Sequence, residues 1–62
     1  MWTVTLCNGR DPIPVLDSWG ARARAVAHLK RRRKGGYEGV VHRVGVSASK
    51  ACALWKARRR KR

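Results

Sequence analysis

Acidic residues, large aromatics and long apolar runs are all scarce in this chain. Its 62 residues include three acidic residues, one tyrosine and no phenylalanine. No run of about 20 apolar residues occurs, so we expect no membrane-spanning helix and no membrane partner. The first residues lack the basic and then apolar segments of a secretory signal, so we expect no export either.

The short length limits the number of domains and the size of the core. A chain of 62 residues forms one domain at most and buries only about 60% of the surface that its unfolded form exposes. We therefore expect residues 1–62 to form a single small basic domain, with residues 58–62 as a frayed basic tail. Three tryptophans and a fair content of valine, alanine and leucine argue against a fully disordered chain.

The few acidic residues do not suggest catalysis. Asp11, Asp17 and Glu38 fit turn, cap and strand-edge positions, and no nucleophile with a positioned base accompanies them. We expect no enzymatic activity and no cofactor.

Cysteine and histidine are also rare, and their spacing argues against a metal site. No C-x₂₋₄-C or H-x₃₋₅-H pair occurs among the candidate zinc ligands, which are Cys7, His28, His42 and Cys52. A Cys7–Cys52 disulfide is geometrically possible but lacks support, because nothing suggests export. We expect Cys52 to be a small buried apolar residue.

Positive charge is what the chain has in abundance. Sixteen Lys and Arg residues against three acidic residues give a formal net charge of +13. Residues 1–29 are nearly neutral, whereas residues 30–62 carry thirteen basic residues and one glutamate. Ten of the thirteen lie in two unbroken runs, Lys30–Lys34 and Arg58–Arg62. Like charges at this density repel one another, so a polyanion is the expected partner.

The basic residues of the second half are therefore the candidate nucleic-acid-binding residues. Their cationic heads suit contacts with phosphate, and the guanidinium groups can contact it in a bidentate manner. The set comprises Lys30, Arg31, Arg32, Arg33, Lys34, Arg43, Lys50, Lys56, Arg58, Arg59, Arg60, Lys61 and Arg62.

The first part of the chain predicts a hairpin. Residues 2–7 alternate between apolar and polar side chains, as a half-buried strand does. Asn8-Gly9 follows and is a strong signal for a two-residue turn, because both residues accept a positive φ. The return strand would cover residues 10–16 at an edge of the sheet, because its two prolines lack N–H donors.

The next segment, residues 18–34, predicts an amphipathic helix. Asp17 or Ser18 can cap its start, and Gly35-Gly36 ends it. Its basic last turn complements the helix dipole. The apolar stripe comprises Trp19, Ala23, Val26 and Leu29, and Leu16 lies close by.

Residues 37–46 are rich in β-branched side chains and predict a third strand. Ser47 can cap a second helix that runs to about Arg59. Its core-facing stripe comprises Ala48, Ala51, Cys52 and Trp55. The element order β-β-α-β-α predicts a small α+β domain, with a short antiparallel sheet and both helices on one face.

This topology also predicts that the two basic runs form one surface. If each connection reverses the chain, the two helices run parallel and their C-terminal ends lie at the same pole. Residues 30–34 and 58–62 would then make a single patch, although they lie far apart in the sequence.

Residues 37–56 offer an alternative, because they resemble the helix-turn-helix pattern of DNA-binding regulators. Gly45-Val46-Ser47 is similar to the turn of that motif. Residues 37–44 would form the first helix and residues 48–56 the recognition helix, after an N-terminal hairpin and helix. This reading implies a protein that reads base sequence in the major groove.

The aromatic residues are expected to serve mainly in the core. Trp2, Trp19 and Trp55 each fall on the apolar face of their element, which favours packing over stacking on bases. Tyr37 has the opposite strand parity to most of the valines and is the aromatic residue most available at the surface.

The favoured function is binding of DNA or RNA, mainly through phosphate contacts and with low sequence specificity. We expect an intracellular location, in the cytoplasm or nucleoid, or in the nucleus of a eukaryotic or viral host. The alternatives are a small phage- or mobile-element-type factor that binds an acidic host protein or ribonucleoprotein, and a helix-turn-helix regulator. A free sheet edge leaves dimerisation open.

Overall fold

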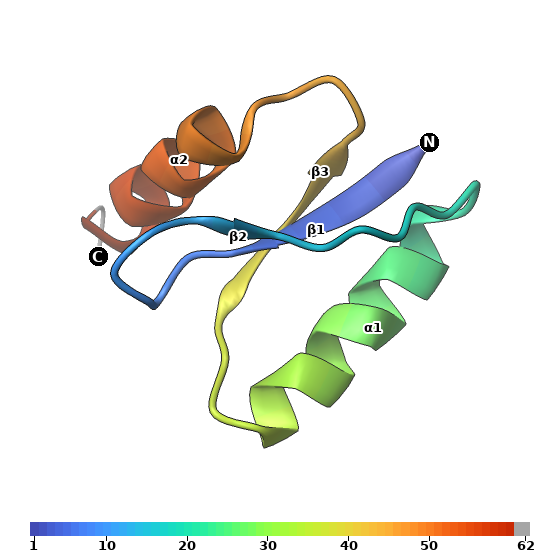
Figure 1. Ribbon diagram of the computed structural model, residues 1–62, viewed down its shortest axis with the longest axis horizontal. Helices are drawn as coiled ribbons and strands as arrows, with labels where there is room; N and C mark the ends of the chain where they lie inside the picture. Colours follow the sequence, from blue (N-terminus) through green and yellow to red (C-terminus); the bar gives the residue numbers. More distant parts are fainter. Residues whose placement is uncertain (61–62) are drawn as a thin grey trace.

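The structure, a computed structural model, describes residues 1–60, which form five elements in the order β-β-α-β-α (Figure 1). This order confirms the predicted small α+β domain. No helix within the described residues is long and apolar enough to cross a membrane. The elements are β1 (Trp2–Leu6), β2 (Ile13–Pro14), α1 (Arg22–Lys34), β3 (Gly39–Arg43) and α2 (Ala48–Arg60).

The three strands form an antiparallel sheet with the order β2-β1-β3. β1 is central, and β3 pairs with it from Trp2↔Arg43 to Leu6↔Gly39. Gly39 is required at this crossing, because a Cβ there would collide with the carbonyl oxygen of Thr5 and lie 2.9 Å from the Cα of Leu6. Residues 39–43 are thus strand, as predicted, and the helix-turn-helix alternative is wrong because its first helix does not form.

The predicted two-residue turn at Asn8-Gly9 is wrong. β1 and β2 pair up to Leu6↔Ile13, so a six-residue loop, residues 7–12, joins them. Neither Asn8 nor Gly9 has a positive φ. The Asn8 side chain instead donates a hydrogen bond to the Gly36 carbonyl oxygen at 2.9 Å, which ties this loop to the one after α1.

β2 is shorter than predicted, but the chain after it continues beside β1. Val15 donates its N–H to the Val4 carbonyl oxygen, and Trp2 and Trp19 exchange two backbone hydrogen bonds. These bonds keep residues up to Trp19 extended, so α1 begins at Arg22 rather than at residue 18. The predicted cap by Asp17 or Ser18 is wrong as well, since Ala21 is the N-cap and makes no side-chain cap bond.

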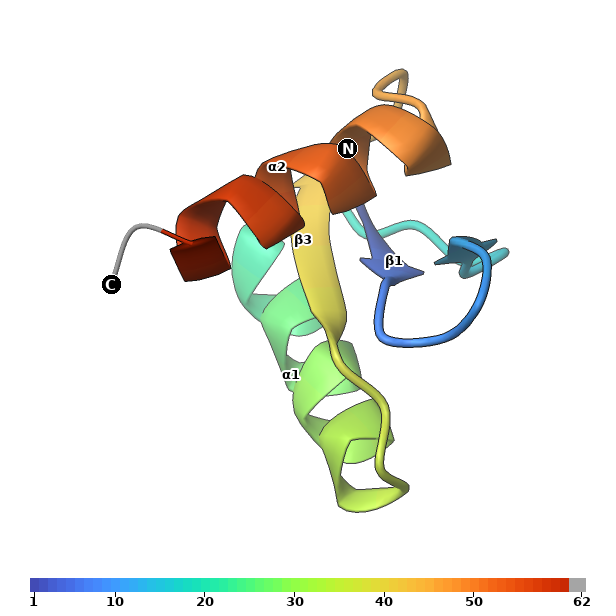
Figure 2. The same ribbon diagram turned by 90° about the vertical axis from the view of Figure 1, so that its left-hand side faces the viewer.

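The two helices lie on opposite faces of the sheet, so the prediction of one shared face is wrong (Figures 1 and 2). The alternation of β1 is the cause. Val4 and Leu6 point to one face and form the core cluster with Ala25 and Leu29 of α1. Cys7 points to the other face and is joined to α2.

The apolar stripe of α1 differs from the predicted one because the helix starts later. Ala25 and Leu29 are buried, whereas Ala23 is exposed and Leu16 is fully exposed before the helix. All three tryptophans are half-buried rather than fully in the core. Trp2 and Trp19 pack against the core cluster with Val15 and Val41, and Trp55 does not belong to it.

A disulfide between Cys7 and Cys52 fastens α2 to the end of β1. The Cα atoms of the two cysteines are 5.4 Å apart, and both residues are 4% exposed. The expectation that Cys52 is only a small buried apolar residue is therefore wrong, because its sulfur is bonded. Ala51 and Cys52 are the residues of α2 that are buried, so the disulfide is a main attachment of this helix.

The signals for the helix ends are largely confirmed. Gly36 has a φ of 90°, and the N–H groups of Gly36 and Tyr37 donate to the carbonyl oxygens of Arg33 and Arg32. These two bonds form the glycine-based C-terminal motif of helices. At the start of α2, the Ser47 hydroxyl accepts from the Lys50 N–H at 3.1 Å, as the predicted cap requires.

Candidate nucleic-acid interface

The first basic run lies in the last turns of α1, and we call residues Lys30–Lys34 the α1 cluster. All five side chains are exposed. The glycine motif ends α1 directly after Lys34, so the cluster lies at the helix terminus where cations complement the dipole. Arg32 donates from Nε to the His28 ring at 3.3 Å, which places its head along the helix surface.

The second basic run begins in the last turn of α2, and we call residues Arg58–Arg60 the α2 cluster. Arg58 and Arg59 are exposed, and the Arg59 guanidinium lies 4.8 Å from the centre of the Trp55 ring. α2 continues through Arg60, in agreement with its predicted extent to about Arg59. Lys61 and Arg62, the other predicted members of this run, lie outside the described residues.

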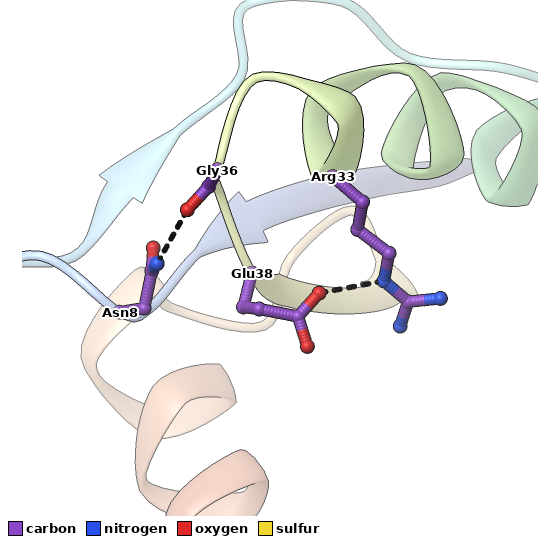
Figure 3. Close-up of polar contacts among 4 residues, drawn as sticks. All are labelled: Asn8, Arg33, Gly36 and Glu38. Carbon is purple, nitrogen blue, oxygen red and sulfur yellow. Dashed lines mark hydrogen bonds and ion pairs between the residues drawn. The ribbon is translucent and has the colours of Figure 1, made fainter.

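Glu38 lies between the two clusters. Its Oε1 accepts a hydrogen bond from Arg33 Nε at 2.7 Å, which is the one ion pair among the described residues (Figure 3). On its other side, Glu38 lines a hollow of about 500 Å³ with Trp55, Arg58 and Arg59. We call this the Glu38 hollow. A carboxylate just before β3 thus contacts α1 and faces the end of α2.

The loops around Glu38 are held in place by neighbouring contacts. The bond from Asn8 to Gly36 joins the loop after β1 to the loop after α1 (Figure 3). The Cys7 N–H donates to the Glu38 carbonyl oxygen at 2.7 Å. The backbone on which the carboxylate sits is therefore fixed to the sheet.

The prediction that the two basic runs form one patch is wrong, because their helices lie on opposite faces of the sheet. Arg33 of the α1 cluster and Arg58 and Arg59 of the α2 cluster nevertheless lie beside Glu38. Glu38 is the one acidic residue between positions 30 and 60. The result is a strongly positive end of the molecule, with a cluster on each flank and Glu38 in the middle.

Three further candidate nucleic-acid-binding residues lie outside the two clusters. Arg43 ends β3 at the opposite end of the sheet, with its guanidinium 5.3 Å from the centre of the Trp2 ring. Lys50 lies in the first turn of α2, away from the α2 cluster. Lys56 precedes Arg59 by three residues, so it shares the side of the helix on which Arg59 lies.

The four zinc-ligand candidates are not brought together. Cys7 and Cys52 are joined as a disulfide, and His42 is hydrogen bonded through Nε2 to the Thr5 hydroxyl at 2.6 Å. His28 lies on α1, on the other face, with its ring centre 4.9 Å from that of Trp19. Among residues 1–60, no group of three or more His, Cys, Asp or Glu side chains could hold a metal ion.

Two residues of the interface were missed by the sequence analysis. Trp55 was assigned to the core, yet it is half-buried and lines the Glu38 hollow. The spacing Trp55-x₃-Arg59 was an available signal, because residues four apart on a helix are neighbours.

Glu38 was treated as a strand-edge residue, and only the fold shows that it faces both helices. Tyr37 is 43% exposed, in agreement with its predicted surface position.

Comparison with other proteins identifies no relative of this chain. The chain matches no protein-family model, no curated protein and no solved structure. The class that the fold defines is a small, strongly basic α+β domain with one disulfide. Any function has to be argued from the positive end of the molecule.

Proposed function

We propose that the protein binds nucleic acid, mainly through contacts between phosphates and the α1 and α2 clusters, with little reading of base sequence. The observation that carries the proposal is the position of both clusters around Glu38, at one end of a compact domain. Exposed guanidinium and ammonium groups at such a site suit a phosphate backbone, and such contacts carry no sequence information by themselves.

A purely structural explanation accounts for only part of the charge. One or two cations in a last turn satisfy the helix dipole, whereas the α1 cluster has five. One of the five, Arg33, is paired with a carboxylate, and this pair is about half exposed. Repulsion among the remaining cations opposes compact folding, and a bound polyanion would remove it.

The size of the domain sets the length of nucleic acid to use. The longest extent of the described part is 29 Å, which corresponds to about eight or nine base pairs of duplex at 3.4 Å each. Oligonucleotides of about twelve residues therefore cover the positive end and leave little room for a second copy.

The test is the salt dependence of binding, measured by fluorescence anisotropy with labelled oligonucleotides. If five phosphates are neutralised on duplex DNA, log K falls with log salt concentration with a slope of about −4.5. Several unrelated sequences should bind with similar affinities. A slope near zero, or an affinity confined to one sequence, would contradict the proposal.

An acidic protein surface or a ribonucleoprotein is the other partner class that the charge admits. A pull-down from lysate with and without nuclease treatment separates the cases. Under our proposal, nuclease removes the captured material. A defined protein that is still captured after complete nuclease digestion would show that the partner is a protein.

An intracellular site of action belongs to this proposal, because nucleic acid is abundant there. The disulfide is relevant to this location, because such bonds persist mainly in oxidising compartments. Both cysteines are 4% exposed, which limits access of glutathione to this bond. Fractionation of cells that produce the protein tests the location: we expect it with the nucleic-acid-containing fraction, and recovery outside the cell would contradict this.

A further inference from the structure

We propose that the Glu38 hollow receives an unpaired nucleobase, so that single-stranded nucleic acid is the preferred ligand. This inference rests on the proposed function and names the form of nucleic acid that the same site takes. It is carried by the hollow itself and by the four residues that line it, Glu38, Trp55, Arg58 and Arg59.

Trp55 provides the surface on which a base can stack. The core cluster on the α1 side does not include it, and among residues 48–59 of α2 only Ala51 and Cys52 are buried. Its indole is half-buried and borders open space on the side of the hollow. Stacking on an exposed aromatic ring is tolerant of sequence because every base has a π-face.

Arg59 and Arg58 place positive charge beside this ring. The Arg59 guanidinium lies 4.8 Å from the ring centre of Trp55, within the range of a cation–π contact. A planar guanidinium over an indole can extend its stack to a base and can also contact the adjoining phosphate. Arg58 lines the same hollow, so a second phosphate contact is within reach of the same nucleotide.

Glu38 supplies a hydrogen-bond acceptor in the same hollow. Its Oε1 accepts a hydrogen bond from Arg33 Nε (Figure 3), and its Oε2 makes no hydrogen bond with residues 1–59. A carboxylate oxygen can accept from the amino group of adenine, cytosine or guanine. Thymine and uracil offer a ring N–H instead, so Glu38 can accept a hydrogen bond from any unpaired base, in keeping with low sequence specificity.

The dimensions favour an unpaired base over a duplex. The hollow of about 500 Å³ falls within the range of small-molecule sites, so one base with its sugar fits. Bases inside a duplex are stacked and paired, and bringing one to Trp55 would require flipping it out. A single strand has no such requirement, and it can continue past Glu38 to the α1 cluster.

The experiment compares single-stranded and duplex DNA of twelve residues or base pairs by anisotropy at one salt concentration, with the oxidised full chain. The variant Trp55→Ala should weaken single-strand binding about tenfold and duplex binding less than about twofold. Trp55→Phe, which keeps an aromatic ring, should retain most of the single-strand affinity. Leu54→Ala, at the exposed neighbouring position, is the matched control and should change neither.

A direct measurement covers the case in which Trp55→Ala does not fold. In the variant W2F/W19F, Trp55 is the one tryptophan that emits, because the chain has three. Single-stranded DNA should quench this emission. Absence of quenching at saturating DNA, or equal losses for single strand and duplex in Trp55→Ala, would overturn the inference.

The two proposals fail differently. If the wild-type protein binds neither form of DNA, or binds without salt dependence, the proposed function fails and this inference fails with it. If both forms bind with a steep salt slope while Trp55 variants bind like the wild type, only the stacking site is refuted.

Discussion

Removal of the Cys7–Cys52 disulfide should strongly destabilise the protein. The bond closes a loop with a sequence separation of 45 residues, for which the chain-entropy model gives about 4 kcal/mol of stabilisation at 25 °C. A domain of 62 residues has a typical free energy of unfolding of roughly 3–9 kcal/mol. Loss of about 4 kcal/mol therefore brings many such domains close to the midpoint of unfolding.

The packing around the disulfide explains why little else would hold α2. Among residues 1–59, seven hydrophobic residues are buried, both cysteines included, and in residues 48–59 of α2 only Ala51 is buried besides Cys52. The other face of the sheet keeps Val4, Leu6, Ala25 and Leu29 in its cluster. We expect α2 to detach first, while part of the α1 face persists.

Urea denaturation followed by tryptophan fluorescence and far-UV circular dichroism measures this effect. The reduced protein should lose the cooperative transition or show a midpoint lower by an amount equivalent to about 4 kcal/mol. The double variant C7A/C52A should behave like the reduced protein and should not respond to reductant. Equal midpoints for oxidised and reduced protein would refute the reasoning.

Three further substitutions test particular contacts. Gly39→Ala should lower the free energy of unfolding in urea by at least about 2 kcal/mol, because the added Cβ meets the backbone of β1. The control Gly20→Ala should lower it little, because nothing lies within 4 Å of a Cβ at that position. Equal losses in the two variants would contradict the close approach of β3 to β1. Ser47→Ala should lower the free energy of unfolding by about 1 kcal/mol, because α2 loses its N-terminal cap. The helical signal of the variant in far-UV circular dichroism should fall, and an unchanged spectrum would refute this. Glu38→Gln should cost less than about 1 kcal/mol, because the ion pair with Arg33 is about half exposed, and a larger loss in the same assay would show a stronger role.

Local signals in the sequence predicted most elements of the fold. The β-branched run before Val46, the Ser47 cap and the glycine pair after Lys34 act through neighbouring residues, so they could be recognised without the tertiary structure. The start of α1 could not, because the bonds that keep residues up to Trp19 extended come from β1. The turn at Asn8-Gly9 failed for a similar reason, since Asn8 is bound to Gly36.

The placement of the helices was the main error, and it changed the candidate site. Element order alone does not determine which face of a sheet a helix covers. The disulfide shows that α2 lies on the face of Cys7, but its formation depends on a spatial approach that the sequence does not display. The basic runs were found from composition, whereas the positions of Glu38 and Trp55 between them required the fold.

The central claim, that the positive end binds phosphate, is tested most directly by two charge-matched variants of one helix. R31A/R32A removes two arginines from the last turns of α1, and R22A/R24A removes two from its first turn; all four are exposed. On duplex DNA, the account predicts that R31A/R32A lowers the steepness of the log K against log salt plot by about 1.8, while R22A/R24A leaves it unchanged. Equal changes in the two variants would contradict the account, because binding would then follow net charge and not the end of the molecule at which the charge lies.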